Sequence, residues 1–235
     1  MIKLVAMDLD GTLTQHKSKP EKECFKVLDE LSKRYRLLVV GAGGCERIFR
    51  QLGSLVFDVI GFYGMQSALS DGKTLSIIQS ATVPVDKSMI TQRIEQLRTE
   101  FGYAAYVGGT AEFHASGIIT FPLLGTAACL KDKLAFDPHR IKRRAIYGRV
   151  REVFNDFTVF VGGSSSFDIV PKPYCKSYAL NKYMEWHGIS REAVIYFGDD
   201  YGFGGNDEDV YKSDIRFIRI DDYKKFPEIA KSILL

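Results

Sequence analysis

The sequence predicts an α/β fold, in which a mostly parallel sheet carries helices on its faces and is interrupted by a smaller α+β module. Three observations lead to this prediction. Two short apolar segments, 2–7 and 193–197, each run directly into carboxylates, as strands do at the ligand-binding edge of an open α/β sheet. Helix-like and strand-like patterns alternate over 21–62. Over 82–173 the pattern changes to short strand-like segments separated by glycines.

The elements of the first part follow from period and punctuation. Residues 21–35 predict an amphipathic helix, because their apolar side chains recur three and four positions apart. Residues 36–40 predict a strand that ends in a glycine-rich turn, and 47–52 predict a short helix. Residues 57–62 then predict another strand, and 70–73 a hairpin turn flanked by β-forming residues.

The central module is predicted to span residues 82–173, which leaves residues 1–81 and 174–235 to form the main domain. It should contain a helix over 86–101 and a second helix from Asp137-Pro138 to about residue 154. Five short strands are expected in it: 103–107, 112–114, 118–121, 158–161 and 166–170. The basic residues of the second helix predict a solvated face, with Ile141, Ala145 and Val150 forming the buried stripe.

Composition narrows the range of functions. The chain has 235 residues, 46% of them hydrophobic, and a formal net charge of +3, which is too small to indicate a nucleic acid or a membrane as partner. No apolar run approaches the length of a membrane span. The N-terminal apolar segment is broken by Lys3 and does not predict a signal peptide. Four cysteines without metal-binding spacing favour reduced thiols and a cytoplasmic location.

The first candidate site is Asp8-Leu9-Asp10-Gly11, at the end of the first apolar segment. Because Gly11 permits a sharp turn, both carboxylates can point to one place. Such a pair can bind Mg²⁺ and also provide an oxygen nucleophile. Taken alone, the same pattern also occurs in ordinary turns that follow a strand.

A second acidic cluster repeats this arrangement. The apolar segment 193–197 leads into Gly198-Asp199-Asp200 and then into Gly204-Gly205-Asn206-Asp207. If the two strands are parallel neighbours, Asp8, Asp10 and Asp199 meet at one edge, and three like charges there call for a cation such as Mg²⁺. The alternative is two unrelated acidic turns on opposite sides of the molecule.

These motifs together resemble a known family. Asp8 to Thr14 is similar to the first motif of the haloacid dehalogenase (HAD) superfamily of phosphatases and phosphomutases, and Gly198 to Asp207 is similar to its metal-binding motif. Within the superfamily, the chain resembles most the eukaryotic-type phosphomannomutases, through four further segments: Gly43-Gly44, Gln51-Leu52-Gly53, Gly162 to Pro171, and Lys176. The resemblance implies a Rossmann-like core with an inserted α+β cap of type C2b.

The resemblance also suggests roles for the acidic residues. Asp8 is the expected nucleophile, which forms an aspartyl-phosphate, and Asp10 is the expected general acid and base. Asp8, the backbone carbonyl of Asp10, and Asp199 are the expected Mg²⁺ ligands. The remaining two, Asn206 and Asp207, are expected to orient metal-bound water or the lysine described next.

The resemblance implies that Lys176 is a third catalytic residue. It also implies a set of substrate-binding residues: Gly43, Gly44, Lys17, Lys133, Ser166 and Asp168. Lys176 corresponds to the lysine that neutralises the phosphoryl oxygens. The glycines Gly43 and Gly44 stand where many superfamily members have a hydroxyl residue, so their backbone N–H groups are expected to bind phosphate instead. Ser166 and Asp168 correspond to residues that contact the sugar hydroxyls.

The chain departs from the phosphomannomutase pattern at positions where those enzymes carry arginine. These positions fall on or near Lys17, His114, Thr126 and Lys133. Because lysine does not reproduce the paired N–H donors of arginine, the grip on a second phosphate should be weaker. Arg140, Arg143 or Arg144 could also supply the missing charge from another direction.

The sequence therefore predicts a Mg²⁺-dependent phosphatase that hydrolyses a sugar phosphate or a similar small phosphorylated metabolite. The alternatives are a phosphomannomutase, which interconverts mannose 1-phosphate and mannose 6-phosphate, and a non-catalytic protein that binds sugar phosphates. Oligomeric state is not encoded in these motifs, although the resembling branch suggests a homodimer formed through the cap.

Overall fold

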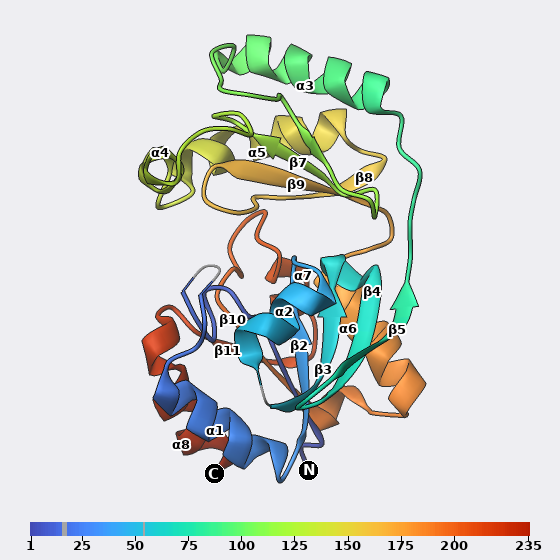
Figure 1. The fold of residues 1–235 in the computed structure, drawn as a ribbon, viewed down its shortest axis with the longest axis vertical. Helices are drawn as coiled ribbons and strands as arrows, with labels where there is room; N and C mark the ends of the chain where they lie inside the picture. The colour runs from blue at the N-terminus through green and yellow to red at the C-terminus, as the bar shows by residue number, and fades with distance from the viewer. Residues whose placement is uncertain (16–17, 54) are drawn as a thin grey trace. The chain divides into compact units, whose positions relative to one another are not determined.

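The computed structural model of the chain describes residues 1–15, 18–53 and 55–235 (Figure 1). Lys17, one of the predicted substrate-binding residues, lies outside these ranges. The chain divides into two compact units. The first, which we call the core, consists of Met1–Ala81, Lys176–Gly202 and Asp207–Leu235. The second, which we call the cap, consists of Thr82–Cys175 and Phe203–Asn206.

The core contains a seven-stranded sheet with the strand order β11-β10-β1-β2-β3-β4-β5. The five strands from β11 to β3 are parallel, and β4 and β5 are antiparallel additions at one edge. The strands are β1 (Leu4–Met7), β2 (Arg36–Val40), β3 (Val56–Gly61), β4 (Gln66–Asp71), β5 (Leu75–Ser80), β10 (Val194–Gly198) and β11 (Arg216–Arg219). The helices are α1 (Lys22–Ser32), α2 (Cys45–Leu52), α6 (Lys176–His187), α7 (Glu208–Tyr211) and α8 (Phe226–Leu234).

Helices cover both faces of this sheet, as predicted from the apolar character of its strands. Along β1, Val5 and Met7 pack with α1, α2 and α8 on one face, whereas Leu4 and Ala6 pack with α6 on the other. Strand side chains alternate between faces, so a strand buried on both sides has to be apolar throughout. The expected α/β fold with a parallel-dominated sheet is confirmed (Figure 1).

The cap has its own antiparallel sheet, with the order β6-β7-β9-β8, and its own apolar core. Its elements are α3 (Lys87–Phe101), β6 (Glu112–Phe113), β7 (Ile119–Pro122), α4 (Leu130–Phe136), α5 (Ile141–Val153), β8 (Phe157–Phe160) and β9 (Ser166–Pro171). Helices α3 and α5 pack their apolar side chains against β7, β8 and β9. The helix α4 was not predicted.

The predicted strand at 103–107 is wrong. Its residues form no strand, because the backbone of Val107 pairs with a loop: its N–H donates to the carbonyl of Leu124 at 3.0 Å, and its carbonyl accepts from Ala127 at 2.9 Å.

The predicted buried stripe of α5 is confirmed at Val150 but is wrong at Ile141 and Ala145, which are exposed. Ile141 is 70% exposed, and the helix buries Arg143 and Tyr147 beside Val150. Arg143 is only 1% exposed because its guanidinium pairs with the Asp137 carboxylate at 2.9 Å and donates to backbone carbonyls of the cap. The positive charge of Arg143 is therefore paired inside the cap.

Candidate active site

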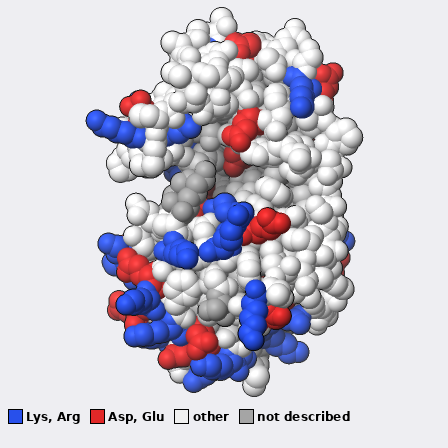
Figure 2. All heavy atoms as spheres, in the orientation of Figure 1, with Lys and Arg blue, Asp and Glu red and all other residues white. Residues whose placement is uncertain are grey.

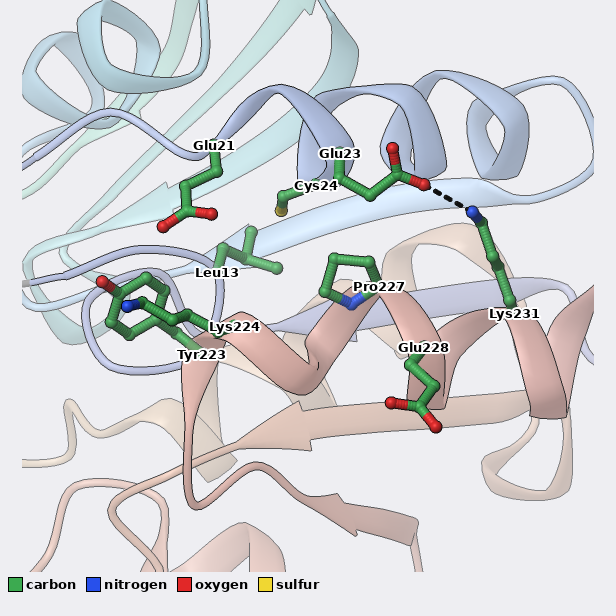
Figure 3. Close-up of a pocket in the computed structure, with 9 residues that line it drawn as sticks. All are labelled: Leu13, Glu21, Glu23, Cys24, Tyr223, Lys224, Pro227, Glu228 and Lys231. Atoms are coloured by element: carbon green, nitrogen blue, oxygen red, sulfur yellow. Dashed lines mark hydrogen bonds and ion pairs between the residues drawn. The ribbon is translucent and has the colours of Figure 1, made fainter.

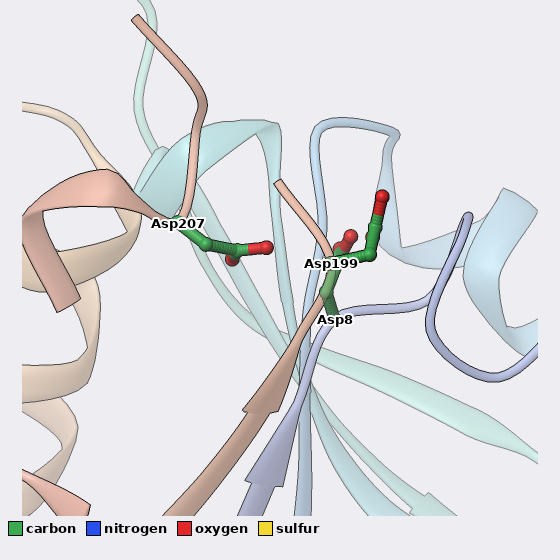
Figure 4. A group of neighbouring side chains, drawn as sticks. All are labelled: Asp8, Asp199 and Asp207. Atoms are coloured by element: carbon green, nitrogen blue, oxygen red, sulfur yellow. The ribbon is translucent and has the colours of Figure 1, made fainter. Parts of the chain in front are cut away.

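The two acidic motifs meet at one edge of the core sheet. Strands β1 and β10 are parallel neighbours, with Met7 opposite Phe197, and the Asp8 N–H donates to the Phe197 carbonyl at 2.9 Å. The polypeptide leaves both strands at the same end of the sheet, so Asp8 and Asp199 lie side by side (Figure 4). This edge is where open α/β sheets bind ligands.

A third carboxylate completes the acidic cluster. Asp8, Asp199 and Asp207 each place one carboxylate oxygen so that all three oxygens lie within 4.8 Å of one another (Figure 4). An all-oxygen donor set of this kind suits Mg²⁺. The sequence predicted Asp10 as a metal ligand through its backbone carbonyl, and Asp207 as a residue behind the ligands; both roles stay predictions. In the structure, Asp207 lies in the cluster, whereas the Asp10 carboxylate is held by helix α2.

Lys176 brings a positive charge into this cluster. It is the first residue of α6 and is 0% exposed, and its Nζ lies 2.8 Å from Oδ1 of Asp8 and 2.8 Å from Oδ1 of Asp207. Burial alone would lower the pKa of Lys176, but the two carboxylates together raise it above its usual value. The lysine therefore carries a charge at neutral pH.

Asp207 is fixed from three directions and is itself completely buried. Besides the Lys176 ammonium, it accepts a hydrogen bond from the Tyr196 hydroxyl at 2.7 Å and from the Asp200 N–H at 3.1 Å. These contacts hold the lysine between the two carboxylates. The geometry suits the expected role of Asp207 in orienting Lys176.

The electrostatics of Asp8 call for additional positive charge. Burial raises the pKa of Asp8 well above its usual value, and the nearby Asp207 and Asp199 raise it further, while Lys176 opposes them. A divalent cation beside these carboxylates would favour the charged form of Asp8. The crowding of buried carboxylates and their all-oxygen donor set thus both fit Mg²⁺.

Gly11 allows the loop after β1 to approach the cluster. Its φ is +102°, and a Cβ at this position would lie 2.4 Å from Oδ2 of Asp199. The next residue, Thr12, donates its hydroxyl to Oδ1 of Asp199 at 3.1 Å. The loop therefore fixes the Asp199 carboxylate, and a side chain at residue 11 would displace it.

Asp10 leaves this loop in a different direction. Its Oδ2 accepts a hydrogen bond from Nη1 of Arg47 at 2.8 Å, and its Oδ1 accepts one from Nε2 of Gln51 at 3.3 Å. Arg47 was not predicted as a site residue. The available signal was its spacing: Arg47 and Gln51 are four residues apart on α2 and therefore lie on one face.

The predicted phosphate-binding glycines lie at the start of α2. Gly44 is its N-cap residue, and its carbonyl accepts from Arg47 and Ile48. The Gly43 carbonyl accepts from the Phe62 N–H at 3.0 Å. Phosphate binding by their N–H groups stays a prediction.

The predicted substrate residues of the cap can be described within that unit. Lys133 lies on α4 and donates to the carbonyl of Thr126 at 3.1 Å. The hydroxyl of Ser166 donates to the Gly162 carbonyl at 3.2 Å, and Asp168 lies two residues further along β9. Their binding roles stay predictions.

Two surface features lie apart from the acidic cluster. On the face drawn in Figure 2, lysine and arginine side chains lie among aspartate and glutamate side chains. A pocket of about 340 Å³ in the core is lined by residues of α1, of α8 and of the segments that precede these helices (Figure 3). The lining includes Glu23 and Lys231, whose charged groups are 2.6 Å apart. None of the acidic cluster residues lines this pocket.

In the described ranges, no helix is both long and apolar enough to cross a membrane.

Comparisons with known proteins agree with the geometry. The family model described as eukaryotic phosphomannomutase matches residues 24–220. A phosphomannomutase of Spinacia oleracea is 27% identical, over 90% of this chain and 87% of that protein. One of Encephalitozoon cuniculi is 25% identical, over 96% of this chain and 93% of that protein.

Solved structures show the same fold. IMP-bound Plasmodium falciparum IMP-nucleotidase, N-terminally truncated, superimposes with a TM-score of 0.69 at 15% identity, over 99% of this chain and 68% of that chain. A phosphatase of the HAD enzyme superfamily from Bacteroides thetaiotaomicron gives a TM-score of 0.56 at 16% identity, over 88% of this chain and 79% of that chain.

Proposed function

Since this chain belongs to the eukaryotic phosphomannomutase family, within the HAD superfamily of phosphoryl-transfer enzymes, we propose that it hydrolyses a sugar phosphate through an aspartyl-phosphate on Asp8. One observation carries this proposal: the buried Lys176 ammonium bridges Asp8 and Asp207 beside Asp199. A carboxylate nucleophile can attack a phosphomonoester only where the charge of the phosphoryl oxygens is offset, and Lys176 supplies fixed positive charge at that place.

The reaction takes two steps. A carboxylate oxygen of Asp8 forms a bond to phosphorus while the bond from phosphorus to the sugar oxygen breaks, and Asp10 gives its proton to the departing oxygen. A water molecule then attacks phosphorus, gives a proton to Asp10 and releases phosphate from Asp8. Asp8, Asp199 and the backbone carbonyl of Asp10 would hold Mg²⁺, which supplies additional charge neutralisation at the phosphoryl group. Lys176 neutralises the phosphoryl oxygens in both steps.

Hydrolysis is proposed over isomerisation because of the residues that stand where the related mutases carry arginine. A mutase must hold the second phosphate of a sugar bisphosphate while the sugar turns round. His114 donates to or accepts from the Thr120 hydroxyl at 3.0 Å, and Thr126 has no charge to offer. Arg143 is occupied within the cap by Asp137. A weak second phosphate site gives water time to take the phosphoryl group.

The second candidate is phosphomannomutase activity, and the curated relatives favour it. The two relatives reported above carry that name at 25% and 27% identity over at least 90% of this chain. This activity requires that the positions without arginine retain a sugar bisphosphate through their remaining contacts. Both candidates share the aspartyl-phosphate on Asp8.

One assay separates the two candidates. The protein is incubated with Mg²⁺, mannose 1-phosphate or glucose 1-phosphate, and the matching sugar bisphosphate, and both inorganic phosphate and sugar 6-phosphate are quantified. We expect more phosphate than 6-phosphate isomer. Isomerisation faster than hydrolysis by about tenfold would establish the mutase instead. A wider screen of phosphorylated metabolites, with an EDTA arm and an Asp8→Asn control, then identifies the substrate.

A further inference from the structure

The carboxylate of Asp10 is held at both of its oxygens by side chains of helix α2. Nη1 of Arg47 donates to Oδ2 at 2.8 Å, and Nε2 of Gln51 donates to Oδ1 at 3.3 Å. Two donors on different oxygens fix the rotation of the carboxyl plane, which one donor alone would leave free.

The two donors also fix each other. The same Nη1 of Arg47 donates to Oε1 of Gln51 at 2.7 Å, and Nε2 of Gln51 donates to the Ser18 carbonyl at 2.8 Å. Gln51 is buried, whereas the Arg47 side chain is 30% exposed. Gln51 therefore anchors the buried side of this hydrogen-bond network, and the charged guanidinium of Arg47 lies on the side nearer to solvent.

Gly43 makes room for this arrangement. A Cβ on Gly43 would lie 2.1 Å from Nε and 2.2 Å from Nη2 of Arg47, far closer than atoms can approach. The guanidinium thus lies directly against the Gly43 backbone. The absence of a side chain at residue 43 is what allows Arg47 to reach Asp10.

The stability of helix α2 does not account for Arg47. The residue lies in the first turn of the helix, where a positive charge opposes the helix dipole. Arg50, one turn further along, shows the ordinary situation: it is exposed and pairs with Glu46 along the helix surface. The contact with Asp10 distinguishes Arg47 from its neighbour.

We propose that Arg47 is a positioning residue, for which Gly43 clears the path, and that it aims the Asp10 carboxyl group at the oxygen that leaves the phosphorus. This inference rests on the proposed function, in which Asp10 gives a proton to that oxygen and recovers one from water. Arg47 forms no bond to phosphorus and exchanges no proton. It fixes the direction in which Asp10 presents its proton.

The test compares two phosphate esters. The oxygen of p-nitrophenol leaves as a stabilised anion and needs no proton, whereas the oxygen of a hexose 6-phosphate has to be protonated as it leaves. The ratio kcat/KM reports the steps up to the first irreversible one, which includes the breaking of this bond. If Asp10 is misdirected, hydrolysis of the hexose ester should therefore slow much more than hydrolysis of the nitrophenyl ester.

For Arg47→Met we expect kcat/KM for hexose 6-phosphate to fall by about 100-fold, while that for p-nitrophenyl phosphate changes by less than about fivefold. Arg47→Lys should recover part of the loss, since it restores a donor but not the planar fork. Arg50→Met, the matched control on the same helix, should behave like the wild type with both esters.

Gly43→Ala provides an independent arm. Alanine keeps the backbone N–H of residue 43, so any phosphate contact of that amide is preserved, but its Cβ displaces the guanidinium. It should reproduce the selective loss of Arg47→Met, and the double variant should be no worse than Arg47→Met alone. Additive losses in the double variant would show that Gly43 does not act through Arg47.

The outcomes distinguish this inference from the proposed function. A wild-type protein that hydrolyses neither p-nitrophenyl phosphate nor any sugar phosphate of the screen would overturn the proposed function. A wild-type protein that hydrolyses both, with Arg47→Met losing the same factor on each ester or losing nothing, would overturn the positioning role alone.

Discussion

Gly11→Ala tests how strictly the loop after β1 controls the acidic cluster. In the structure, a Cβ at residue 11 would lie between 2.4 and 2.6 Å from three carboxyl atoms of Asp199, whereas ordinary contacts begin near 3.4 Å. The Asp199 carboxylate must therefore retreat by about 1 Å, which strains its hydrogen bond with Thr12. The φ of +102° adds a backbone cost of about 1–3 kcal/mol for a non-glycine residue.

The expected consequences follow from that displacement. A misplacement of about 1 Å can reduce turnover by about 100-fold. If Asp199 binds Mg²⁺, the Mg²⁺ concentration needed for half-maximal activity should rise by about 10-fold to 100-fold, as it does when the surroundings of metal ligands are disturbed. Steady-state phosphate release over a Mg²⁺ titration measures both quantities, and urea denaturation measures the stability.

Gly188→Ala is the matched control. Gly188 also lies in the core and also has a positive φ, of +60°, but a Cβ there meets nothing within 4 Å. This variant should lose only the backbone contribution to stability, about 1–2 kcal/mol, and keep its activity and its Mg²⁺ response. A Gly11→Ala protein as active and as responsive to Mg²⁺ as Gly188→Ala would refute the reasoning.

Three further predictions concern buried charges and thiols. Lys176→Met should reduce turnover by about 10²–10³-fold and destabilise the Mg²⁺-free protein by about 3–5 kcal/mol in urea titrations, because it leaves buried carboxylates without their cation. Asp137→Asn should lower the free energy of unfolding by a similar amount, because it leaves the buried charge of Arg143 without its carboxylate partner. Burial raises the pKa of Asp137, but hydrogen bonds from Arg143 outweigh this effect and lower the pKa below its usual value. The stabilisation by this pair is therefore present above the usual aspartate pKa and should disappear as the pH falls through the lowered pKa. A stability difference between wild type and Asp137→Asn that stays unchanged in acid would contradict this prediction. Burial raises the pKa of Cys24 to about 12, so at pH 8 only about 10⁻⁴ of it is thiolate, and a thiol reagent should label it only after unfolding.

The sequence predicted the meeting of Asp8 and Asp199 because parallel neighbouring strands end at the same edge of a sheet. That rule needs only the order of the elements and the position of each carboxylate after its strand. The α/β fold, the hairpin around residues 70–73 and the apolar faces of α1 follow in the same way from local patterns.

Other features depend on tertiary contacts that no local pattern records. Arg143 was expected on the surface because arginine usually is, but a buried carboxylate and several backbone carbonyls of the cap satisfy it. The strand expected at 103–107 is absent because Val107 pairs with a loop. Arg47 reaches Asp10 only because Gly43, two residues before its helix, leaves the space open.

The loop between Asp199 and Asp207 shows the same limit. Its middle residues, 203–206, belong to the cap by their contacts, although both ends belong to the core. The Gly204 carbonyl accepts from the Val161 N–H at 2.8 Å, and Phe203 lies edge-on to Tyr147. The sequence motif was interpreted as a metal-binding loop alone, and the cap residues that hold its middle lie far away in the chain.

The identity of the nucleophile is the central claim, and chemical trapping tests it most directly. During turnover of a phosphorylated substrate with Mg²⁺, the protein is treated with borohydride, which reduces an aspartyl-phosphate to homoserine, and its peptides are sequenced by mass spectrometry. We predict homoserine at residue 8 in the wild type, dependent on substrate, and none in Asp8→Asn. Reduction at a different residue, or turnover with Asp8 left unmodified throughout, would contradict the account.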